Sequence, residues 1–472
     1  MFGLHIDKSL SVSIAQQLIT QIRYQVLQGK LKGGEKLPPS RNLAKELNVA
    51  RNIIIQVYDQ LIAEGYLESR VGSGTFIIDL KSFHLNQPAG QNKTIRHEEP
   101  MTYIRDNVID FHSGNPDVSH FPRIQWAKIL KETCLEAPSD TFGYGPVAGE
   151  PPLRSAISRY LFRTKGIDCH PDHIFIVPGA TLGVDLLCKV FHKDIDNVVI
   201  EDPCISFVQH TFMQNGFSIH PVPVDHQGIK TFELPENHKI KLIYVVPSHQ
   251  FPIGSILPIG RRLQLLDYAR DRNAYIIEDD YDSEFRYEGG PIMSLHHLDP
   301  ERVIYLGTFS KIFSPSLRLG YIILPSNLIK RVYTFMELIN IRTPSLEQLA
   351  MARFIDTKLI DRHVYKMKKV YQKKRKHLIN SLYLAFGDKV RVAGENAGLH
   401  VLTAFKDLEF HPSDFQKFLE NGVEVDWVED YAIRKGLHIN QLVLGYGNIS
   451  LEQITVGVQR IKEVINGKFL QK

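Results

Sequence analysis

From Val108 to the end of the chain, short runs of β-forming residues alternate with segments of helical period. The clearest runs are Ile174–Val177, Asn197–Ile200, Leu242–Val246, Tyr275–Ile277 and Val303–Leu306. Such alternation predicts βα units and therefore an α/β fold with a mostly parallel central sheet. In open sheets of this kind, ligands bind beyond the carboxyl ends of the strands. Polar residues that directly follow these runs are therefore the first candidates for a functional site.

The composition agrees with a folded protein that carries more than one domain. The chain has 472 residues, of which 43% are apolar and 23% are charged, and this excludes a disordered or fibrous protein. The length allows roughly two to four domains. No run approaches the about 18–20 apolar residues of a membrane span, and the first residues lack the pattern of a secretory signal. We therefore expect a soluble cytoplasmic protein with no membrane partner. The net charge of +4 is too small to indicate a nucleic-acid partner by itself.

The first eighty residues predict three helices and a hairpin. Apolar residues recur every fourth position from Ile14 to Val26, and this helix ends at Gly29. The hydroxyl of Ser40 is placed to cap a short second helix. A third helix follows, with its apolar residues at Ile54, Val57, Tyr58, Leu61 and Ile62. Two short β-type runs then meet across Gly72-Ser-Gly74. This order predicts a winged helix-turn-helix.

The same stretch resembles the GntR family of bacterial DNA-binding domains. The resemblance rests on Leu37-Pro-Pro-Ser-Arg41-Asn-Leu-Ala, on Asn48-Val-Ala-Arg51-Asn52, and on Glu64-Gly-Tyr followed by Gly72-Ser-Gly-Thr-Phe76. It implies that residues 1–78 form the DNA-binding domain, that Arg41, Arg51 and Asn52 contact double-stranded DNA, and that Gly72 lets the wing approach the backbone. An arginine fork at the start of a helix in the major groove agrees with this role. The alternative is that these arginines only solvate a surface helix.

Residues 79–107 are predicted to be a linker between two domains. They lack a sustained apolar period and are rich in Gln, Asn, Gly and Pro. A stretch of this length without structure is improbable inside one compact domain. The second domain is therefore expected to span residues 108–472.

Three polar motifs that follow predicted strands together match the needs of pyridoxal 5'-phosphate (PLP). They are Thr308-Phe-Ser-Lys311 with Arg318 seven positions later, Asp279-Asp-Tyr281, and Pro178-Gly-Ala-Thr181. A lysine amine forms the Schiff base with the aldehyde, and a carboxylate keeps the pyridine nitrogen protonated. A helix N-terminus, a hydroxyl and an arginine suit the phosphate.

The residue types assign a role to each position. Lys311 is the expected Schiff-base lysine, Asp279 the partner of the ring nitrogen, and Tyr281 the donor to the phenolic oxygen of the ring. The expected phosphate ligands are Gly179, Ala180, Thr181, Thr308 and Arg318. The alternative at Asp279 is a buried structural ion pair.

The region beyond Val108 resembles the fold-type I aminotransferases over nearly its whole length. The segment Tyr144-Gly-Pro-Val-Ala-Gly-Glu-Pro-Pro-Leu-Arg154 belongs to this resemblance. In that family the tyrosine of this segment reaches the phosphate in the neighbouring subunit. The resemblance therefore implies that Tyr144 binds the cofactor across a homodimer.

A GntR-like head joined to an aminotransferase-like body resembles the MocR subfamily of transcriptional regulators. Ser248-His-Gln-Phe-Pro-Ile-Gly254 and Glu278-Asp-Asp-Tyr-Asp-Ser-Glu-Phe-Arg-Tyr287 are similar to sequences of that subfamily. The resemblance implies a PLP-binding regulator rather than an enzyme.

Three departures from the aminotransferase pattern bear on the effector. Phe251 stands where aminotransferases place an Asn before Pro-x-Gly, and Asp202-Pro-Cys-Ile205 lacks the aromatic of amino-acid-responsive relatives. The arginine that binds a substrate α-carboxylate is missing as well. Val443 occupies its expected place, and neither Arg434 nor Arg460 falls on the motif. We therefore expect that PLP alone is the effector, as in PdxR-type regulators of vitamin B6 synthesis.

Two other functions remain open from the sequence. One is a MocR regulator that responds to a PLP–amino acid adduct, and the other is an active aminotransferase with a DNA-binding head. The pair His296-His297 lacks further ligand-spaced partners, so no metal site is expected. The basic run Lys366–Lys376 is expected to be a solvated helix face rather than a DNA contact. The operator, the regulated genes and the sign of regulation are not encoded in any motif.

Overall fold

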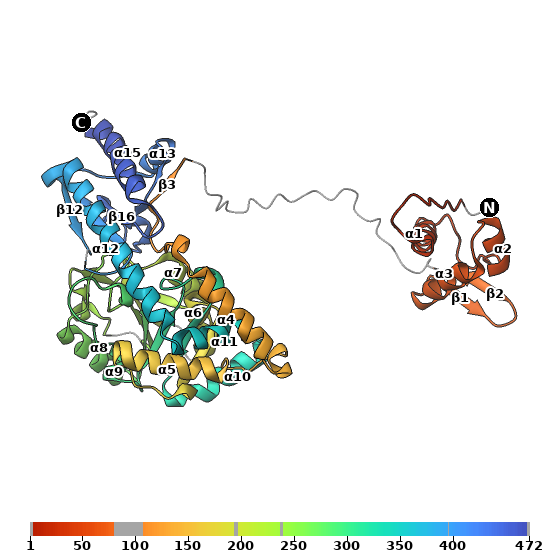
Figure 1. The fold of residues 1–472 in the computed structure, drawn as a ribbon, viewed down its shortest axis with the longest axis horizontal. Helices are drawn as coiled ribbons and strands as arrows, with labels where there is room; N and C mark the ends of the chain where they lie inside the picture. The colour runs from red at the N-terminus through yellow and green to blue at the C-terminus, as the bar shows by residue number, and fades with distance from the viewer. Residues whose placement is uncertain (1–2, 80–106, 193–196, 237–238, 395, 470–472) are drawn as a thin grey trace. The chain divides into compact units, whose positions relative to one another are not determined.

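The computed structural model describes residues 3–79, 107–192, 197–236, 239–394 and 396–469. The chain divides into two compact units, Met1–Thr102 and Tyr103–Lys472 (Figure 1). The predicted linker, residues 79–107, lies outside the described residues apart from its two ends. Among the helices described, none combines the length and apolar character needed to cross a membrane.

The smaller unit is the predicted winged helix-turn-helix. Its elements are α1 (Ile14–Leu27), α2 (Ser40–Glu46), α3 (Arg51–Ala63), β1 (Leu67–Arg70) and β2 (Gly74–Ile77). The apolar stripes of α1 and α3 face each other, and Leu18, Ile54 and Leu61 are fully buried between them. The two strands pair antiparallel from Leu67 with Ile77 to Arg70 with Gly74, and they form the wing.

The expected cap of the second helix is wrong in its detail. Pro39, not Ser40, occupies the N-cap position of α2, and no side chain caps that helix. Pro39 already has the extended backbone that this position needs, so Ser40 becomes the first helical residue. Its hydroxyl instead accepts a 3.4 Å hydrogen bond from Nε of Arg51.

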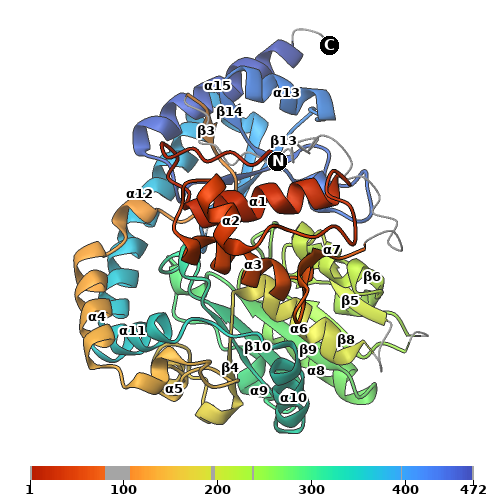
Figure 2. The ribbon, with the colours of Figure 1, turned by 90° about the vertical axis from the view of Figure 1, so that its right-hand side faces the viewer.

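The larger unit is built on an eight-stranded, mostly parallel sheet, as predicted. Its order is β4-β11-β10-β9-β8-β5-β6-β7 (Figure 2). Strands β4, β5, β6, β8, β9 and β10 run in one direction, and β11 and β7 run in the opposite direction. The bounds are β4 Ile174–Val177, β5 Asn197–Asp202, β6 Ser218–Asp225, β7 Gly228–Ile229, β8 Leu242–Val245, β9 Tyr275–Asp280, β10 Val303–Thr308 and β11 Gly320–Ile323.

Alternating side chains of these strands enter different hydrophobic clusters on the two faces of the sheet. Tyr244 and Ile277 pack on the face covered by α6 (Ala180–Phe191), α7 (Ser206–Gln214) and α10 (Ile329–Ile339). Ile243 and Ile276 pack on the other face with α8 (Ile259–Asp271). The same alternation directs the consecutive carboxylates at the end of β9 to opposite faces.

Further helices cover the sheet beside α8. They are α4 (Arg123–Glu136), α5 (Pro151–Lys165), α9 (Leu295–Leu298), α11 (Ser345–Asp356) and the long α12 (Leu359–Phe386). Figure 1 shows α12 running from the region of the large sheet to a second, smaller sheet.

The second sheet has the order β12-β13-β16-β15. The C-terminal elements are β12 (Val390–Ala393), β13 (His400–Phe405), α13 (Pro412–Glu420), β14 (Val423–Glu424), β15 (Asp426–Trp427), α14 (Val428–Tyr431), β16 (Gln441–Gly445) and α15 (Leu451–Phe469). The short strand β3 (Ile109–Asp110) pairs with β14. The chain therefore enters the larger unit through this C-terminal region.

Candidate functional site

A cavity of about 190 Å³ lies at the carboxyl ends of β8, β9 and β10. Its lining brings together most of the residues predicted from the motifs. The predicted residues in the lining are Ala180, Thr181, Asp279, Tyr281, Thr308, Lys311 and Arg318, and Gly179 directly precedes the first of them.

Lys311 follows β10 and is the buried amine of the cavity. Its Nζ donates a 2.6 Å hydrogen bond to the carbonyl oxygen of Gly114. Burial lowers the pKa of Lys311, and Arg318 lowers it further, while Asp282 and Asp279 oppose the change. A lowered pKa favours the neutral amine, which is the form that attacks a carbonyl carbon.

Asp279, the second-last residue of β9, has one carboxylate oxygen that is hydrogen-bonded and one that is not. Its Oδ2 accepts a 2.5 Å hydrogen bond from the hydroxyl of Tyr244. Its Oδ1 is buried and has no hydrogen-bond partner among the described residues. Burial raises the pKa of Asp279 to about 7. A buried carboxylate oxygen without a donor is costly, so this atom fits a ligand that supplies an N–H.

One end of the cavity is built for an anion. Gly179 has a φ of +92° and precedes α6, whose first-turn N–H groups have no intrahelical acceptors. Arg318 donates a 2.8 Å hydrogen bond from Nη2 to the carbonyl oxygen of Pro178. A Cβ on Gly179 would lie 2.9 Å from that same Nη2, so only glycine leaves room for the guanidinium. The helix N-terminus and the arginine together suit a phosphate.

Tyr281 lines the cavity, but its hydroxyl is held by a histidine. It donates a 3.1 Å hydrogen bond to the carbonyl oxygen of His249 and lies 3.1 Å from Nδ1 of that residue. The same Nδ1 lies 3.0 Å from Oδ2 of Asp282. His249 therefore fixes the orientation of the Tyr281 side chain through its hydroxyl.

Tyr144 is not part of this cavity. Its side chain is 85% exposed, and it follows a short 3₁₀ turn at Ser139–Phe142. The expected role of Tyr144, which is to bind the phosphate of the neighbouring subunit, stays a prediction.

The cavity also contains residues that the motif analysis missed. They are Ser113, Gly114, Tyr244, Val246, Pro315, Leu399 and His400. Ile205 lines the cavity at the position where amino-acid-responsive relatives have the aromatic, and Phe207, two positions later, lines it as well. Ile205 and Phe207 both come shortly after the end of β5. A hydroxyl in mid-strand, as at Tyr244, gives no signal in the sequence.

The two arginines that the sequence analysis placed off the carboxylate-binding motif have other partners. Nε of Arg434 lies 3.1 Å from Oδ2 of Asp202. Nη1 of Arg460 donates to the carbonyl oxygens of Asn107 and Gly422. Val443 is fully buried in β16. Within the described part of the chain, the cationic side chains that line the cavity are Lys311 and Arg318.

The smaller unit presents the residues predicted for DNA contact on its surface. Arg41 lies near the start of α2, and Arg51 and Asn52 begin α3, all three exposed. No side chain caps α3 at Ala50. Gly72, at the tip of the wing, has a φ of +75° and open space around the position of a Cβ. The exposed cationic helix starts and the open wing tip are compatible with a phosphate backbone.

Family models match both units. Residues 14–77 match the bacterial regulatory proteins of the gntR family, and residues 106–426 match aminotransferase class I and II. The smaller unit is therefore a DNA-binding domain, and the larger unit has the aminotransferase fold.

Relatives with both units are named as regulators. The chain is 34% identical to the uncharacterized HTH-type transcriptional regulator YdeL of Bacillus subtilis, over 97% of this chain and 98% of the relative. It is 33% identical to the protein of Rhizobium meliloti named probable rhizopine catabolism regulatory protein MocR, over 85% of this chain and 84% of the relative. The chain belongs to the MocR subfamily of GntR regulators. The chain is also 31% identical to the HTH-type pyridoxine biosynthesis transcriptional regulator PdxR of Corynebacterium glutamicum, over 83% of each chain.

The body of this MocR-type regulator is similar to working enzymes. A multiple substrate aminotransferase from Thermococcus profundus superposes with a TM-score of 0.72 at 26% identity. The match covers 78% of this chain and 93% of the enzyme. The regulator and the enzyme thus share a fold, and the function must be argued from the residues of the site.

Proposed function

We propose that this DNA-binding regulator uses its larger unit to bind PLP and that PLP itself is the effector. Lys311 would bind the aldehyde carbon, Asp279 the pyridine nitrogen, and Arg318 with the start of α6 the phosphate. Bound PLP would supply an electrophilic carbon and an electron-withdrawing ring. The remaining roles belong to the protein, which orients the ring and holds its charged groups.

Two observations support the fit of this cofactor. The free Oδ1 of Asp279 is a buried acceptor that a protonated ring nitrogen would satisfy. The space beside Gly179 is kept open for the guanidinium of Arg318 at the N-terminus of α6. An ordinary structural ion pair at Asp279 would need a cationic partner, and no cationic side chain within the described chain forms such a salt bridge with it.

The inference that PLP acts without an amino acid rests on the cationic residues that line the cavity. Arg318 is assigned to the phosphate, and no other arginine among the described residues lines the cavity, so no guanidinium is left for an α-carboxylate. Burying a carboxylate that has no cationic partner costs several kcal/mol of binding free energy. The pocket therefore discriminates against the amino acid part of a PLP adduct.

The same residues argue against an aminotransferase that turns over. Phe251 lines the cavity where the aminotransferase pattern has an Asn for the ring oxygen. A phenyl ring cannot donate a hydrogen bond to that oxygen. Because the relative PdxR is named for the regulation of pyridoxine biosynthesis, we include the regulation of vitamin B6 synthesis in the proposal. We also include a homodimer, in which the exposed Tyr144 of one subunit would complete the phosphate site of the other.

Titration of operator binding tests the proposal. The probe is a DNA duplex selected from a random pool by the full-length protein, and its affinity is measured by gel shift with increasing PLP. We expect PLP alone to change the affinity, with no further change when amino acids are added. An absolute requirement for an amino acid would overturn PLP as the sole effector. Multiple-turnover transamination would overturn a purely sensory body.

A further inference from the structure

A second cavity, of about 270 Å³, opens beneath the sheet face opposite to Asp279. It lies between the end of α5, the segment that follows β9, and α12. Its lining consists of Tyr160, Thr164, Lys165, Ser283, Glu284, Arg286, Gly289, Gly290, Pro291, Ile292, Asp361, Val364, Tyr365 and Lys368. None of these described residues lines the proposed PLP cavity.

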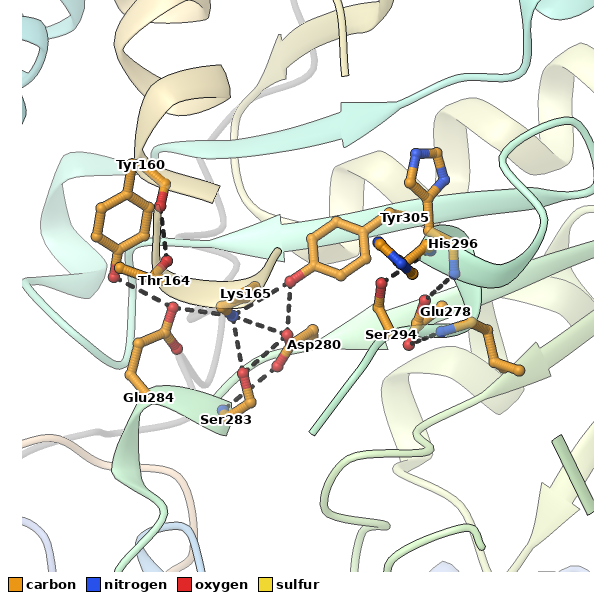
Figure 3. Close-up of polar contacts among 12 residues, drawn as sticks. Tyr160, Thr164, Lys165, Glu278, Asp280, Ser283, Glu284, Ser294, His296 and Tyr305 are labelled. Atoms are coloured by element: carbon orange, nitrogen blue, oxygen red, sulfur yellow. Dashed lines mark hydrogen bonds and ion pairs between the residues drawn. The ribbon is translucent and has the colours of Figure 1, made fainter. Parts of the chain in front are cut away.

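One wall of this second cavity is a closed network of charges around Lys165. Nζ of Lys165 lies 2.7 Å from Oδ2 of Asp280 and 2.9 Å from Oε1 of Glu284 (Figure 3). The hydroxyl of Tyr305 donates to the same Oδ2 at 2.5 Å. Figure 3 shows Asp280 and Glu284 reaching Lys165 from different sides. Lys165 is therefore fully engaged and leaves no charge for a ligand.

The acidic residues in the lining are also neutralised. Glu284 is held by Lys165, and Oδ2 of Asp361 lies 2.8 Å from Nη2 of Arg163. An incoming anion would thus not meet an unpaired carboxylate among the described residues of the lining.

Arg286 is the basic residue that the network leaves out. Its Nε and Nη1 are buried and have no hydrogen-bond partner in the described part of the chain. Its guanidinium lies against Gly289, which has a φ of +77° and whose Cβ would come within 3.0 Å of Nη2. Buried charged groups are normally paired, because an unpaired one keeps its full desolvation cost. Lys368, half-buried on α12, likewise forms no ion pair with a described residue.

We propose that this cavity binds the carboxylate or phosphate group of a small metabolite, held by Arg286 and Lys368. The planar fork of a guanidinium matches the geometry of both oxyanions, and an ammonium adds charge without fixing direction. The hydroxyls of Ser283 and Thr164 lie in the same lining and offer further polar contacts. The site would be a second effector site, separate from the PLP cavity.

Equilibrium dialysis on the full-length, PLP-saturated protein tests the proposal. PLP fills the phosphate end of the other cavity, so radiolabelled inorganic phosphate and radiolabelled citrate can report on this one. We expect at least one of the two anions to bind saturably, at one site per chain. Phosphate alone would assign a phosphate ligand, and citrate alone a carboxylate. No saturable binding in either arm would overturn the proposal.

Variants locate the site. We expect Arg286→Gln to weaken binding at least tenfold and Lys368→Gln to weaken it several-fold. Lys366→Gln, an exposed change on the same helix that faces a different cavity, should leave the affinity unchanged. Unchanged binding in Arg286→Gln would overturn the assignment. If that chain does not fold, Lys368→Gln decides, and unchanged affinity there has the same meaning.

Thermal unfolding separates a ligand-binding arginine from a structural one. Since Arg286 has no described protein acceptor, Arg286→Gln should unfold at or above the wild-type temperature in anion-free buffer. The upward shift that the bound anion gives the wild type should be absent from the variant. A clear loss of stability without anion would show a structural role and contradict the proposal.

Discussion

The side-chain amine of Lys311 donates a 2.6 Å hydrogen bond to the carbonyl oxygen of Gly114. The neighbouring Ser113 is in turn bound to Oδ2 of Asp426 through its backbone N–H at 2.8 Å and its hydroxyl at 2.9 Å. These residues follow β3, which is the first strand after residues 79–107. The amine proposed to bind PLP is thus hydrogen-bonded to a segment that lies near the start of the larger unit in the sequence. A ligand that engages Lys311 must compete with this hydrogen bond. If PLP binds more tightly to the state in which the bond is broken, PLP shifts the population of the protein toward that state.

Replacing the amine should separate ligand binding from DNA binding. We expect Lys311→Ala to lose the visible absorbance of protein-bound PLP and the effect of PLP on operator affinity. Operator binding without PLP should persist, because α2, α3 and the wing do not involve Lys311. Loss of one hydrogen bond should cost about 1 kcal/mol of unfolding free energy. Absorbance spectra and gel shifts measure both effects, with exposed Lys330→Ala as the control. An unchanged spectrum in Lys311→Ala would contradict the site.

A larger residue at Gly114, the hydrogen-bond partner of Lys311, tests whether this contact couples PLP binding to DNA binding. Gly114 has a φ of +79°, and a Cβ there would lie 3.0 Å from Nζ of Lys311. Gly114→Ala should therefore cost about 1–2 kcal/mol in the backbone and weaken the hydrogen bond in the ligand-free state. We expect the operator affinity without PLP to move toward the PLP-saturated value, so that the response shrinks.

The control for this change is Gly260→Ala, on α8, where a Cβ meets open space. It should keep the full response to PLP in the same gel shifts. A full response in Gly114→Ala as well would show that the contact does not take part in signalling.

The DNA-binding residues are expected to act independently of the larger unit. Arg51→Ala should weaken binding to the selected operator by about 1–3 kcal/mol and relax its sequence preference, since an arginine fork reads base edges. PLP absorbance should not change. Fluorescence anisotropy at fixed salt gives the affinity, and Lys30→Ala, after the end of α1, removes the same charge as a control. Equal losses in the two variants would indicate a purely electrostatic effect.

The sequence predicted the fold class because its strands and helix stripes are local patterns. β10 and β9 end at Thr308 and Asp280, so the strand pattern alone could place the lysine and the carboxylate at the same sheet edge. Gly114 and Tyr244 could not be found in this way. Gly114 reaches Lys311 across 197 positions of sequence, and Tyr244 is a buried mid-strand residue whose hydroxyl gives no periodic signal.

The basic run on α12 shows a second limit of local patterns. Most of its lysines are exposed or half-buried as predicted, but Lys374 is only 7% exposed. Its Nζ lies 2.7 Å from Oδ2 of Asp117 and 2.8 Å from the carbonyl oxygen of Gly447. Charge pattern cannot reveal a partner 257 positions away. Only the packing of α12 against the start of the larger unit explains why this lysine is buried.

Stability should fall at alkaline pH through His112. A hydrogen bond to Asp110 raises the pKa of His112 to about 9 against burial, with further help from Asp426 and Glu424. Nδ1 lies 2.7 Å from Asp110 and 4.0 Å from Glu424, and Nε2 lies 3.4 Å from Asp426. A raised pKa means that the folded state holds the proton more tightly than the unfolded state. The contribution is therefore complete below about pH 6.5, the ordinary value for histidine, and is lost as the pH rises through about 9.

Urea unfolding at a series of pH values measures this contribution. Because the side chain is 42% exposed, solvent screening reduces the expected loss between about pH 6.5 and 9 to about 1 kcal/mol. His112→Gln should remove that part of the slope, while exposed His226→Gln should keep it. The same slope in wild type and His112→Gln would show that the histidine is not held charged by the three carboxylates. Since His112 directly precedes Ser113 and Gly114, a confirmed loss would also place a pH-sensitive contact beside the segment that meets Lys311.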